Sequence, residues 1–322
     1  MKIAVVGATG LVGREVVKIL LDKKLVRAEE LTLFASKSSS GKILSYGDVE
    51  LCVNELSKKN IKKYDYAIFC AGKKVSKEFF KSFIDRGAVV IDNSSAFRRE
   101  KNVPLVVPQI NINTVGSAKL IANPNCSTIG ASLPLFYLSK TYKIKRVIVS
   151  TYQAVSGAGQ NGVSDLQQNT KTKFAHEICN NLIPQIDVSL SNGYTYEEDK
   201  MSFELKKILS NRFLKISATC VRVPILNCHS ESINVEFDTE PDLRKIKQIL
   251  GDCDGIRLVD CLKKDEYPMP ILANGTDDVL VGRIRRDTSN KNAINLFICF
   301  DNVRKGAALN AVEIVEKLAK LN

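Results

Sequence analysis

One of the nine cysteines lies where a thiolate would be stabilised. Cys126 follows the extended run 119–122 and Pro124, and a helical pattern begins at Ser127. We expect Ser127 or Thr128 to cap that helix, because short hydroxyl side chains accept hydrogen bonds from unpaired backbone N–H groups. These N–H groups and the positive end of the helix dipole favour the thiolate, which is the nucleophilic form of cysteine. The position predicts a catalytic thiol, and a buried structural cysteine is the alternative.

Only two histidines could serve that thiol as an acid or base near neutral pH. We expect His176 late in a helix over residues 162–177, in a capping or packing role. His229 and Arg222 belong to one proline-broken loop between two strands, which brings an imidazole and a guanidinium together. A loop histidine by itself is commonly structural, but beside a candidate thiolate we interpret His229 as the acid/base partner of Cys126.

A glycine-rich turn follows the first apolar run of the chain and opens the first helical one. Gly7 permits a tight turn, Gly10 lets the backbone approach a pyrophosphate, and Gly13 allows close packing of helix on strand. The spacing is G-x-x-G-x-x-G, one residue wider than the usual fingerprint, and a merely structural turn is the alternative. The residues expected to bind a dinucleotide here are Gly7, Thr9, Gly10, Leu11, Val12 and Gly13, with Ala71 and Gly72 after a later strand.

The end of the second expected strand favours NADP over NAD. An acidic residue there would bind the ribose 2′-hydroxyl and repel a 2′-phosphate. This chain instead has Ser36, Lys37 and Ser39, a cation among hydroxyls, so a phosphate would be attracted. A solvated polar loop is the alternative interpretation.

Strands and helices alternate in the first half of the chain, which predicts a parallel, doubly wound, Rossmann-like sheet. The expected strands are 2–6, 30–35, 65–70 and 88–92, with short ones near Val106 and Leu120, and the expected helices are 12–23 and 76–86.

Longer alternating runs follow Cys126 and predict an α+β domain with a mainly antiparallel sheet. The expected strands are 146–153, 213–223, 232–237, 280–286 and 293–300, and the expected helices are 162–177, 197–209, 242–250 and 306–321. The fold class is therefore α/β in two domains. An NADP-binding domain covers 1–126 and is completed by 302–322, while 127–301 form a catalytic and dimerisation domain. Residues 182–196 suggest an insertion or a subunit-contact loop.

Composition excludes several classes of protein. The chain has 322 residues, a formal net charge of +12 and an odd number of cysteines without a C-x-x-C pair, so we expect reduced thiols, no metal site and a cytoplasmic protein. The N-terminus is a strand leading into the glycine turn and not a signal peptide, and apolar runs are too short to cross a membrane. The lysines are scattered among acids, which argues against nucleic-acid binding.

The chain resembles the bacterial type of aspartate-β-semialdehyde dehydrogenase. The resemblance covers nearly the whole length and lies in separate motifs that together are specific. They are GATGLVG (7–13), DNSSAFR (92–98), PNCST (124–128), TYQAVSGAG (151–159), EEDKM (197–201), RVPILNCHSES (222–232) and DNVRKGAALNAVEI (301–314).

The resemblance implies NADPH-dependent conversion of L-aspartyl-4-phosphate to L-aspartate-4-semialdehyde and phosphate, a step toward lysine, threonine, methionine and diaminopimelate. Cys126 would carry a thioacyl group, His229 would be the general acid/base, and Gln153 would position the substrate. The implied substrate-binding residues are Arg222 for the α-carboxylate, Glu197 for the α-amino group, and Lys200, Arg98 and Asn125 for the phosphate. Ser156, Gly157 and Asn302 would lie by the nicotinamide, and the second domain would form a homodimer.

Other interpretations stay open at this point. N-acetyl-γ-glutamyl-phosphate reductases use the same Cys–His chemistry, but they carry a glycine and an aromatic residue where this chain has Asn125 and Ser127. A non-catalytic NADP-binding redox sensor is the alternative from another class. Without the resemblance, Glu197 and Lys200 would be interpreted as a surface ion pair, and Arg98 as part of a solvated arginine pair.

Overall fold

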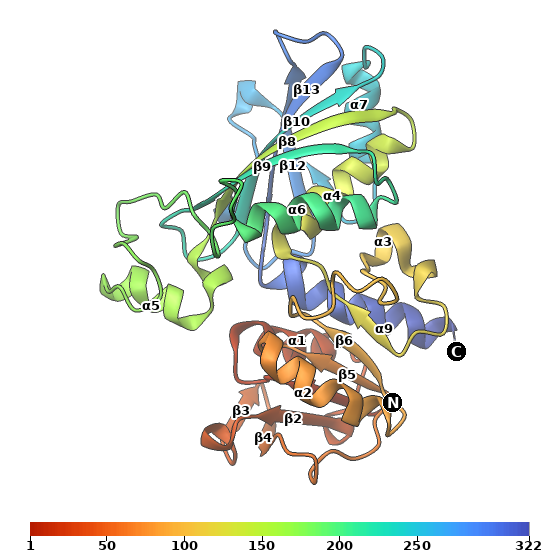
Figure 1. Cartoon of the computed structure of the whole chain (residues 1–322), viewed down its shortest axis with the longest axis vertical. Helices are drawn as coiled ribbons and strands as arrows, with labels where there is room; N and C mark the ends of the chain where they lie inside the picture. The colour runs from red at the N-terminus through yellow and green to blue at the C-terminus, as the bar shows by residue number, and fades with distance from the viewer. Residues whose placement is uncertain (322) are drawn as a thin grey trace. The chain divides into compact units, whose positions relative to one another are not determined.

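The computed structural model describes residues 1–321, and the chain divides into two compact units (Figure 1). The first unit consists of residues 1–124 and the C-terminal segment from Ala307, and the second of residues 125–306. Asn322, the last residue of the expected segment 302–322, lies outside the described residues.

A seven-stranded sheet forms the centre of the first unit, in the order β3-β4-β2-β1-β5-β6-β7. All neighbours are parallel except β3 and β4, which confirms the predicted doubly wound sheet. The strands are β1 (Ile3–Val6), β2 (Leu31–Ala35), β3 (Ile43–Tyr46), β4 (Val49–Glu55), β5 (Tyr66–Phe69), β6 (Val89–Asp92) and β7 (Leu120–Ala122). The β3–β4 hairpin was not predicted. The strand expected near Val106 is a single bridge between Leu105 and Ala122.

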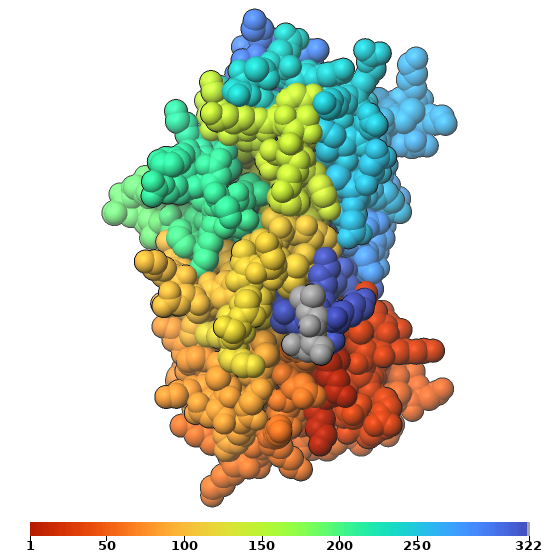
Figure 2. All heavy atoms as spheres, turned by 90° about the vertical axis from the view of Figure 1, so that its right-hand side faces the viewer, coloured from red at the N-terminus to blue at the C-terminus, as the bar shows by residue number. Residues whose placement is uncertain are grey.

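Alternate residues of β1 enter two separate cores. Ile3 and Val5 face the core formed with α1 (Leu11–Asp22) and α9 (Leu309–Leu321), whereas Ala4 and Val6 face the aromatic core formed with α2 (Lys73–Ile84). This arrangement follows from the period of two along a strand that is buried on both faces. Figure 2 shows the C-terminal segment against the N-terminal one, where Lys23 and Glu316 form an ion pair at 3.2 Å. A π-helical turn, Arg304–Ala308, precedes α9, so the helix begins later than the predicted residue 306.

A six-stranded sheet forms the centre of the second unit, in the order β11-β12-β13-β10-β8-β9. It is antiparallel except for the pairs β11–β12 and β8–β9, which confirms the predicted mainly antiparallel sheet. The strands are β8 (Ile144–Gln153), β9 (Lys215–Arg222), β10 (His229–Phe237), β11 (Ile256–Leu258), β12 (Val279–Arg286) and β13 (Ala293–Phe300).

Three helices cover one face of this second sheet: α4 (Cys126–Ser139), α6 (Tyr196–Ile208) and α7 (Leu243–Gly251). The shorter helices are α3 (Pro108–Asn111) in the first unit, and α5 (Gln160–Gln168) and α8 (Pro270–Ala273) in the second. Odd-numbered residues of β10, and those of β8 from Val147 on, are buried toward the three covering helices, and these include the polar side chains of Gln153 and His229.

The predicted helix over residues 162–177 is wrong in its second half. The helix ends at Gln168, and Asn169 adopts a left-handed conformation with φ of 51°. The carboxylate of Asp165 then accepts hydrogen bonds from the backbone N–H groups of residues 172, 173 and 174 at 2.9, 2.7 and 3.1 Å. Because these N–H groups bond a side chain, they are not available to helical carbonyls, and His176 lies in an exposed loop.

The described helices include none that is long and apolar enough to span a bilayer. Within residues 1–321, no cluster of three or more His, Cys, Asp or Glu side chains could hold a metal ion.

Candidate active site

Cys126 is the first residue of α4, at the N-terminal end where the sequence predicts it. The cap is Asn125 and not Ser127 or Thr128, because its Oδ1 accepts from the backbone N–H groups of both residues at 3.0 and 3.4 Å. The predicted cap is therefore wrong by two or three residues. The asparagine satisfies N–H groups of the first turn, and the thiol remains beside that turn.

His229 lies against this thiol, with its Nε2 3.2 Å from Cys126 Sγ. The backbone N–H of Ala154 donates to Nδ1 at 3.0 Å, so Nδ1 carries no proton. A neutral imidazole then has its proton on Nε2, directed at the sulfur. Burial and, as a smaller cause, the positive charge of Arg222 hold the pKa of His229 well below its ordinary value of 6.5. The ring is therefore neutral at neutral pH.

Arg222 ends β9 and His229 begins β10, so the two residues flank the loop in which the sequence places them. Arg222 Nη1 donates to the carbonyl of Ala154 at 2.7 Å. A Cβ on Gly157 would approach Arg222 Nη1 to 3.0 Å and His229 Nε2 to 3.1 Å. A glycine at 157 therefore leaves room between the guanidinium and the imidazole.

Helix α6 supplies a row of charged side chains at helical spacing, Glu197, Lys200 and Glu204. A capping box of Thr195 and Glu198 starts the helix, and Glu198 also accepts from the backbone N–H of Cys220 at 3.0 Å. This second contact joins the first turn of α6 to β9 and thereby fixes where the charged row lies.

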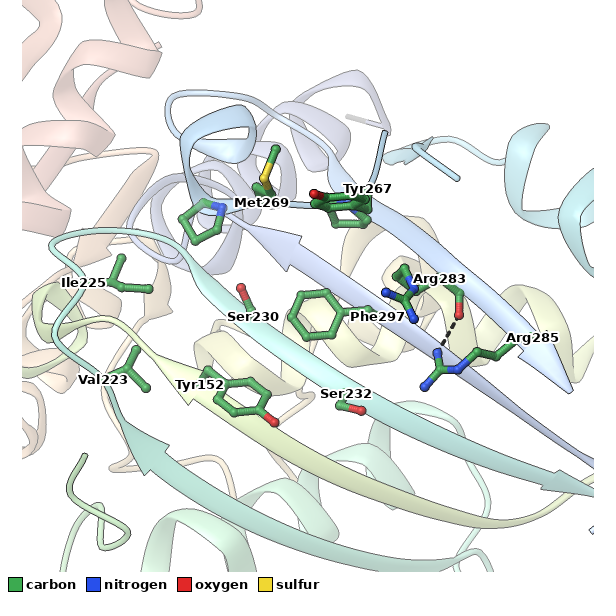
Figure 3. Close-up of a pocket in the computed structure, with 12 residues that line it drawn as sticks. Tyr152, Val223, Ile225, Ser230, Ser232, Tyr267, Met269, Arg283, Arg285 and Phe297 are labelled. Carbon is green, nitrogen blue, oxygen red and sulfur yellow. Dashed lines mark hydrogen bonds between the residues drawn. The ribbon is translucent and has the colours of Figure 1, made fainter. Parts of the chain in front are cut away.

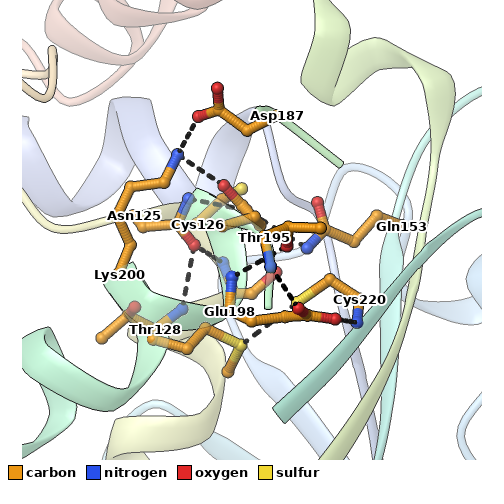
Figure 4. A network of polar contacts seen from close by, with 12 residues as sticks. Asn125, Cys126, Thr128, Gln153, Asp187, Thr195, Glu198, Lys200 and Cys220 are labelled. Atoms are coloured by element: carbon orange, nitrogen blue, oxygen red, sulfur yellow. Dashed lines mark hydrogen bonds and ion pairs between the residues drawn. The ribbon is translucent and has the colours of Figure 1, made fainter. Parts of the chain in front are cut away.

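Glu197 is the centre of a buried polar network, part of which is drawn in Figure 4. Its carboxylate accepts from Asn125 Nδ2 at 2.9 Å and Gln153 Nε2 at 3.2 Å, and it pairs with Lys200 Nζ at 2.6 Å. Burial would raise the pKa of Glu197, but Lys200 and the two amides outweigh it and lower that pKa. The alternative of an exposed Glu197–Lys200 surface pair is wrong, because both side chains are buried.

Two predicted nicotinamide-contacting residues of the second unit also lie together. Ser156 Oγ is 3.0 Å from Nδ2 and 3.2 Å from Oδ1 of Asn302, whose Oδ1 accepts from the backbone N–H of Cys228 at 2.9 Å. The loop that precedes His229 is thereby tied to the segment that follows β13.

The glycine loop, residues 7–13 of the first unit, has the geometry of a phosphate cradle. Gly7 has φ of 84°, and a Cβ on it would lie 2.8 Å from the carbonyl carbon of Cys70. A Cβ on Gly13 would lie 2.2 Å from the carbonyl oxygen of Gly7, so helix α1 packs directly on the turn. Around Gly10 the space is open, with the nearest such contact at 3.5 Å. Open backbone at a helix N-terminus suits a dinucleotide pyrophosphate.

The remaining predicted residues of the first unit follow neighbouring strands. Ser36 and Lys37 are exposed after β2, where Lys37–Ser39 form a 3-10 turn, and Ala71 and Gly72 connect β5 to α2. Arg98 belongs to this unit, and its Nη2 donates to the carbonyl of Asn93 at 2.8 Å.

Some residues of the site were not predicted. Glu204, whose carboxylate accepts from the backbone N–H of Asn125 at 2.7 Å, could have been found from its spacing after Glu197 and Lys200. Asp187, which pairs with Lys200 at 2.9 Å, follows no pattern in the sequence. Ala154 acts through its backbone, which leaves no signal in its residue type.

Beside the network, Glu231 of β10 is completely buried, and neither oxygen has a hydrogen-bond partner among the described residues. Burial and the nearby charge of Glu197 raise the pKa of Glu231 well above its ordinary value. The acid is therefore neutral in the folded protein over a range of pH in which an exposed glutamate is charged.

The opposite face of the second sheet carries a pocket that α4, α6 and α7 do not cover (Figure 3). Its floor has Tyr152 of β8, Ser230 and Ser232 of β10, and Phe297 of β13. Arg283 and Arg285 of β12 border it, and residues 267–270 complete its wall. The thiol and the pocket thus use opposite faces of one sheet.

A dinucleotide-type unit together with a Cys–His pair on an α+β unit is typical of a dehydrogenase. Family models agree: the semialdehyde dehydrogenase NAD-binding domain matches residues 2–118, and the semialdehyde dehydrogenase dimerisation domain matches residues 134–305. The chain is 45% identical to an aspartate-semialdehyde dehydrogenase of Aquifex aeolicus, over 99% of this chain and 98% of that one. It belongs to the aspartate-semialdehyde dehydrogenase family.

Solved structures support the same assignment. Aspartate semialdehyde dehydrogenase II of Vibrio cholerae, complexed with ASA, has a TM-score of 0.93 and 37% identity, covering 99% of this chain and 98% of that one. The enzyme of Candida albicans, solved with NADP, has a TM-score of 0.77 and 27% identity, covering 99% of this chain and 98% of that chain. The chain is accordingly an oxidoreductase that uses a nicotinamide cofactor.

Proposed function

We propose that this chain reduces L-aspartyl-4-phosphate with NADPH to L-aspartate-4-semialdehyde and phosphate, through a thioacyl group on Cys126. The observation that carries the proposal is the 3.2 Å contact of Cys126 Sγ with His229 Nε2 at the start of α4. A thiolate there is stabilised by the helix end and by the Nε2 proton. Metabolically, the product leads to lysine, threonine, methionine and diaminopimelate.

The thiolate of Cys126 forms a bond to the acyl carbon, and the bond from that carbon to the phosphate oxygen breaks, with its electron pair leaving on phosphate. A bound NADPH supplies the hydride that reduces the thioacyl carbon. The carbon–sulfur bond then breaks, which releases the aldehyde and restores the thiolate. His229 acts first as a hydrogen-bond donor, because its Nδ1 is occupied by the N–H of Ala154. The thiol proton passes to solvent before the attack, because Nε2 already carries the one proton of the neutral ring, and His229 donates this Nε2–H to the sulfur whenever the sulfur is a thiolate.

The charged side chains around the thiol each bind a different group of the substrate. Arg222, a planar fork of donors, binds the α-carboxylate, and Glu197 binds the α-ammonium group. Lys200 and Asn125 bind the phosphate, together with Arg98 from the first unit. Gln153, which donates to Glu197 at 3.2 Å, keeps the substrate beside the thiol.

NADP is proposed over NAD because a lysine and hydroxyls, with no acid, follow β2. In this proposal the glycine loop, Ala71 and Gly72 bind the pyrophosphate side of the cofactor, and Lys37, Ser36 and Ser39 bind the 2′-phosphate. Ser156, Gly157 and Asn302 contact the nicotinamide. The crystal structure of the Candida albicans relative with NADP supports this choice.

The active enzyme is proposed to be a homodimer joined by the pocket-bearing face of the second sheet. Support comes from the match to a dimerisation domain and from Tyr152 at the pocket, which is 39% exposed. A cytoplasmic location stays a prediction; it fits nine cysteines that are thiols and not disulfides.

The test is phosphate-dependent reduction of NADP with aspartate semialdehyde, with N-acetylglutamate semialdehyde in parallel. Turnover with the first compound alone is expected. Turnover only with the second compound would show that the chain has the activity of an N-acetyl-γ-glutamyl-phosphate reductase. Binding of NADP without turnover of either compound would favour a redox sensor. Sedimentation of the same preparation measures the dimer.

A further inference from the structure

A strap, residues 183–195, passes between the strand that carries Arg222 and the helix that carries Lys200. At one end, Ile183 and Arg222 exchange two backbone hydrogen bonds of 3.0 and 2.9 Å. At the other end, the backbone N–H of Tyr196, the first residue of α6, donates to the carbonyl of Val188 at 2.8 Å. The strap is therefore fixed on both sides of Asp187.

Asp187 has an uncommon backbone conformation that directs its carboxylate toward Lys200. Its φ is 69°, in the left-handed region, which aspartate tolerates when its side chain bonds locally. Oδ1 accepts from the backbone N–H of Val188 at 2.9 Å, and Oδ2 accepts from Lys200 Nζ at 2.9 Å. Figure 4 shows Asp187 reaching Lys200 from outside the network.

Lys200 thus has two acidic partners, of unequal depth. Glu197 lies 2.6 Å away with a side chain 5% exposed, whereas Asp187 lies 2.9 Å away with a side chain 34% exposed. Burial lowers the pKa of Lys200, but Glu197 and Asp187 outweigh it and raise that pKa to about 12. The ammonium is therefore charged at neutral pH, and it faces two carboxyl groups.

We propose that Asp187 is a resident counter-ion of Lys200, which phosphate must displace, and that it thereby lowers the affinity for phosphate and speeds its release. The inference rests on the proposed function, in which Lys200 binds the phosphate group. Two amides hold Glu197 in place, so Asp187 is the partner that phosphate can displace from Lys200. A dianion beside Lys200 meets like charge as long as Asp187 remains there.

Two variants remove the charge and keep the backbone. Asp187→Asn and Asp187→Gly both tolerate a left-handed φ, since asparagine and glycine are the residues that adopt it most readily. Glu177→Gln is the matched control, because it removes one carboxylate from an exposed pair with Lys171 at 3.8 Å, on the segment that leads to the strap. The thermal unfolding midpoint of each variant reports whether it folds as the wild type does.

The experiment measures the KM for phosphate and the KM for aspartate semialdehyde in the NADP-reducing direction, at constant ionic strength. In both Asp187 variants we expect the phosphate KM to fall about three- to tenfold, while the semialdehyde KM stays unchanged. Product inhibition by phosphate in the reductive direction should tighten by the same factor. Glu177→Gln should leave all three constants as in the wild type.

A phosphate KM that is unchanged or higher in both Asp187 variants would overturn the inference, and so would a rise in the semialdehyde KM alone, which would assign Asp187 to the substrate ammonium. If the wild type and Glu177→Gln show no phosphate-dependent turnover, the proposed function is rejected and this inference with it. Turnover by the wild type with no shift in the variants rejects the inference only.

Discussion

The glycine loop and the thiol site are built in opposite ways. The glycine loop is one continuous stretch, residues 7–13, and its shape depends on the absence of side chains. The thiol site combines side chains from α4, β8, β9, β10 and α6, and hydrogen bonds join these elements to one another. In the proposed function, cofactor binding therefore depends on backbone sterics, whereas the chemistry depends on a long-range polar network. Substitutions in one region should therefore leave the other region's function intact.

The largest expected effect separates chemistry from cofactor binding. Cys126→Ser replaces the thiolate by a hydroxyl that stays protonated, so kcat should fall by at least about 1000-fold. The dissociation constant for NADPH, measured by fluorescence titration, should equal that of the wild type. Residual turnover within tenfold of the wild type would contradict a covalent thioacyl step.

The converse change breaks the glycine loop and spares the thiol. In Gly13→Ala the new Cβ would lie 2.2 Å from the carbonyl oxygen of Gly7, so the turn must move. We expect NADPH affinity to fall about 100-fold, which corresponds to about 3 kcal/mol of strain and lost contacts. The rate at which iodoacetamide alkylates Cys126 should be unchanged.

Gly251→Ala is the control for this change, because its Cβ would meet only Leu258 Cδ2, at 3.7 Å. If both glycine variants weakened NADPH equally, sterics in the loop would not be the cause.

A smaller effect tests charge in the cofactor site. Lys37→Glu should weaken NADPH about tenfold and leave NADH nearly unchanged, because only NADPH carries the 2′-phosphate. Lys42→Glu, a nearby exposed lysine, makes the same change in net charge and should weaken neither cofactor selectively. Equal losses for both dinucleotides would remove Lys37 from the 2′-phosphate site.

The smallest effect concerns how the free energy of unfolding of the protein depends on pH. The folded-state pKa of Glu231 is raised above its ordinary value of 4.5, so the unfolded state loses this proton first as pH rises. The free energy of unfolding therefore falls with pH above about 4.5, by up to about 1.4 kcal/mol per pH unit from this group.

Glu231→Gln removes that titration, and urea unfolding at pH 6 and pH 7 should show a smaller loss of stability in the variant than in the wild type. Identical slopes for the two proteins would show that Glu231 ionises in the folded state.

Most of the fold could be predicted because its strands follow simple apolar patterns. The buried run of β1 and the alternation of β8 and β13 each predict the sheet in which they lie. The hairpin of β3 and β4 was missed because it is short, lies at the sheet edge and leaves residues such as Ile43 60% exposed. The prediction of a helix after residue 168 is wrong because Asp165 accepts hydrogen bonds from three backbone N–H groups. No hydrophobic periodicity encodes such a contact.

The site could be predicted as a set of residue types but not as a geometry. A cysteine at a helix start, a loop histidine and a motif with Glu197 and Lys200 are visible in the sequence. The proton position on His229 depends on the backbone of Ala154, and the charge around Lys200 depends on Asp187. Such contacts are fixed by tertiary structure, which places segments far apart in the chain beside one another.

The return of α9 to the first unit has a consequence for how the chain is made. On the ribosome, residues 1–124 emerge first, yet their core includes Leu309, Val312 and Ile314 from the last helix. The intervening unit can fold as soon as it leaves the exit tunnel, since domains fold as units during synthesis. The first unit, although translated first, completes its folding last. A premature stop codon shortly before α9 would leave a chain whose second unit is complete but whose first unit lacks part of its core.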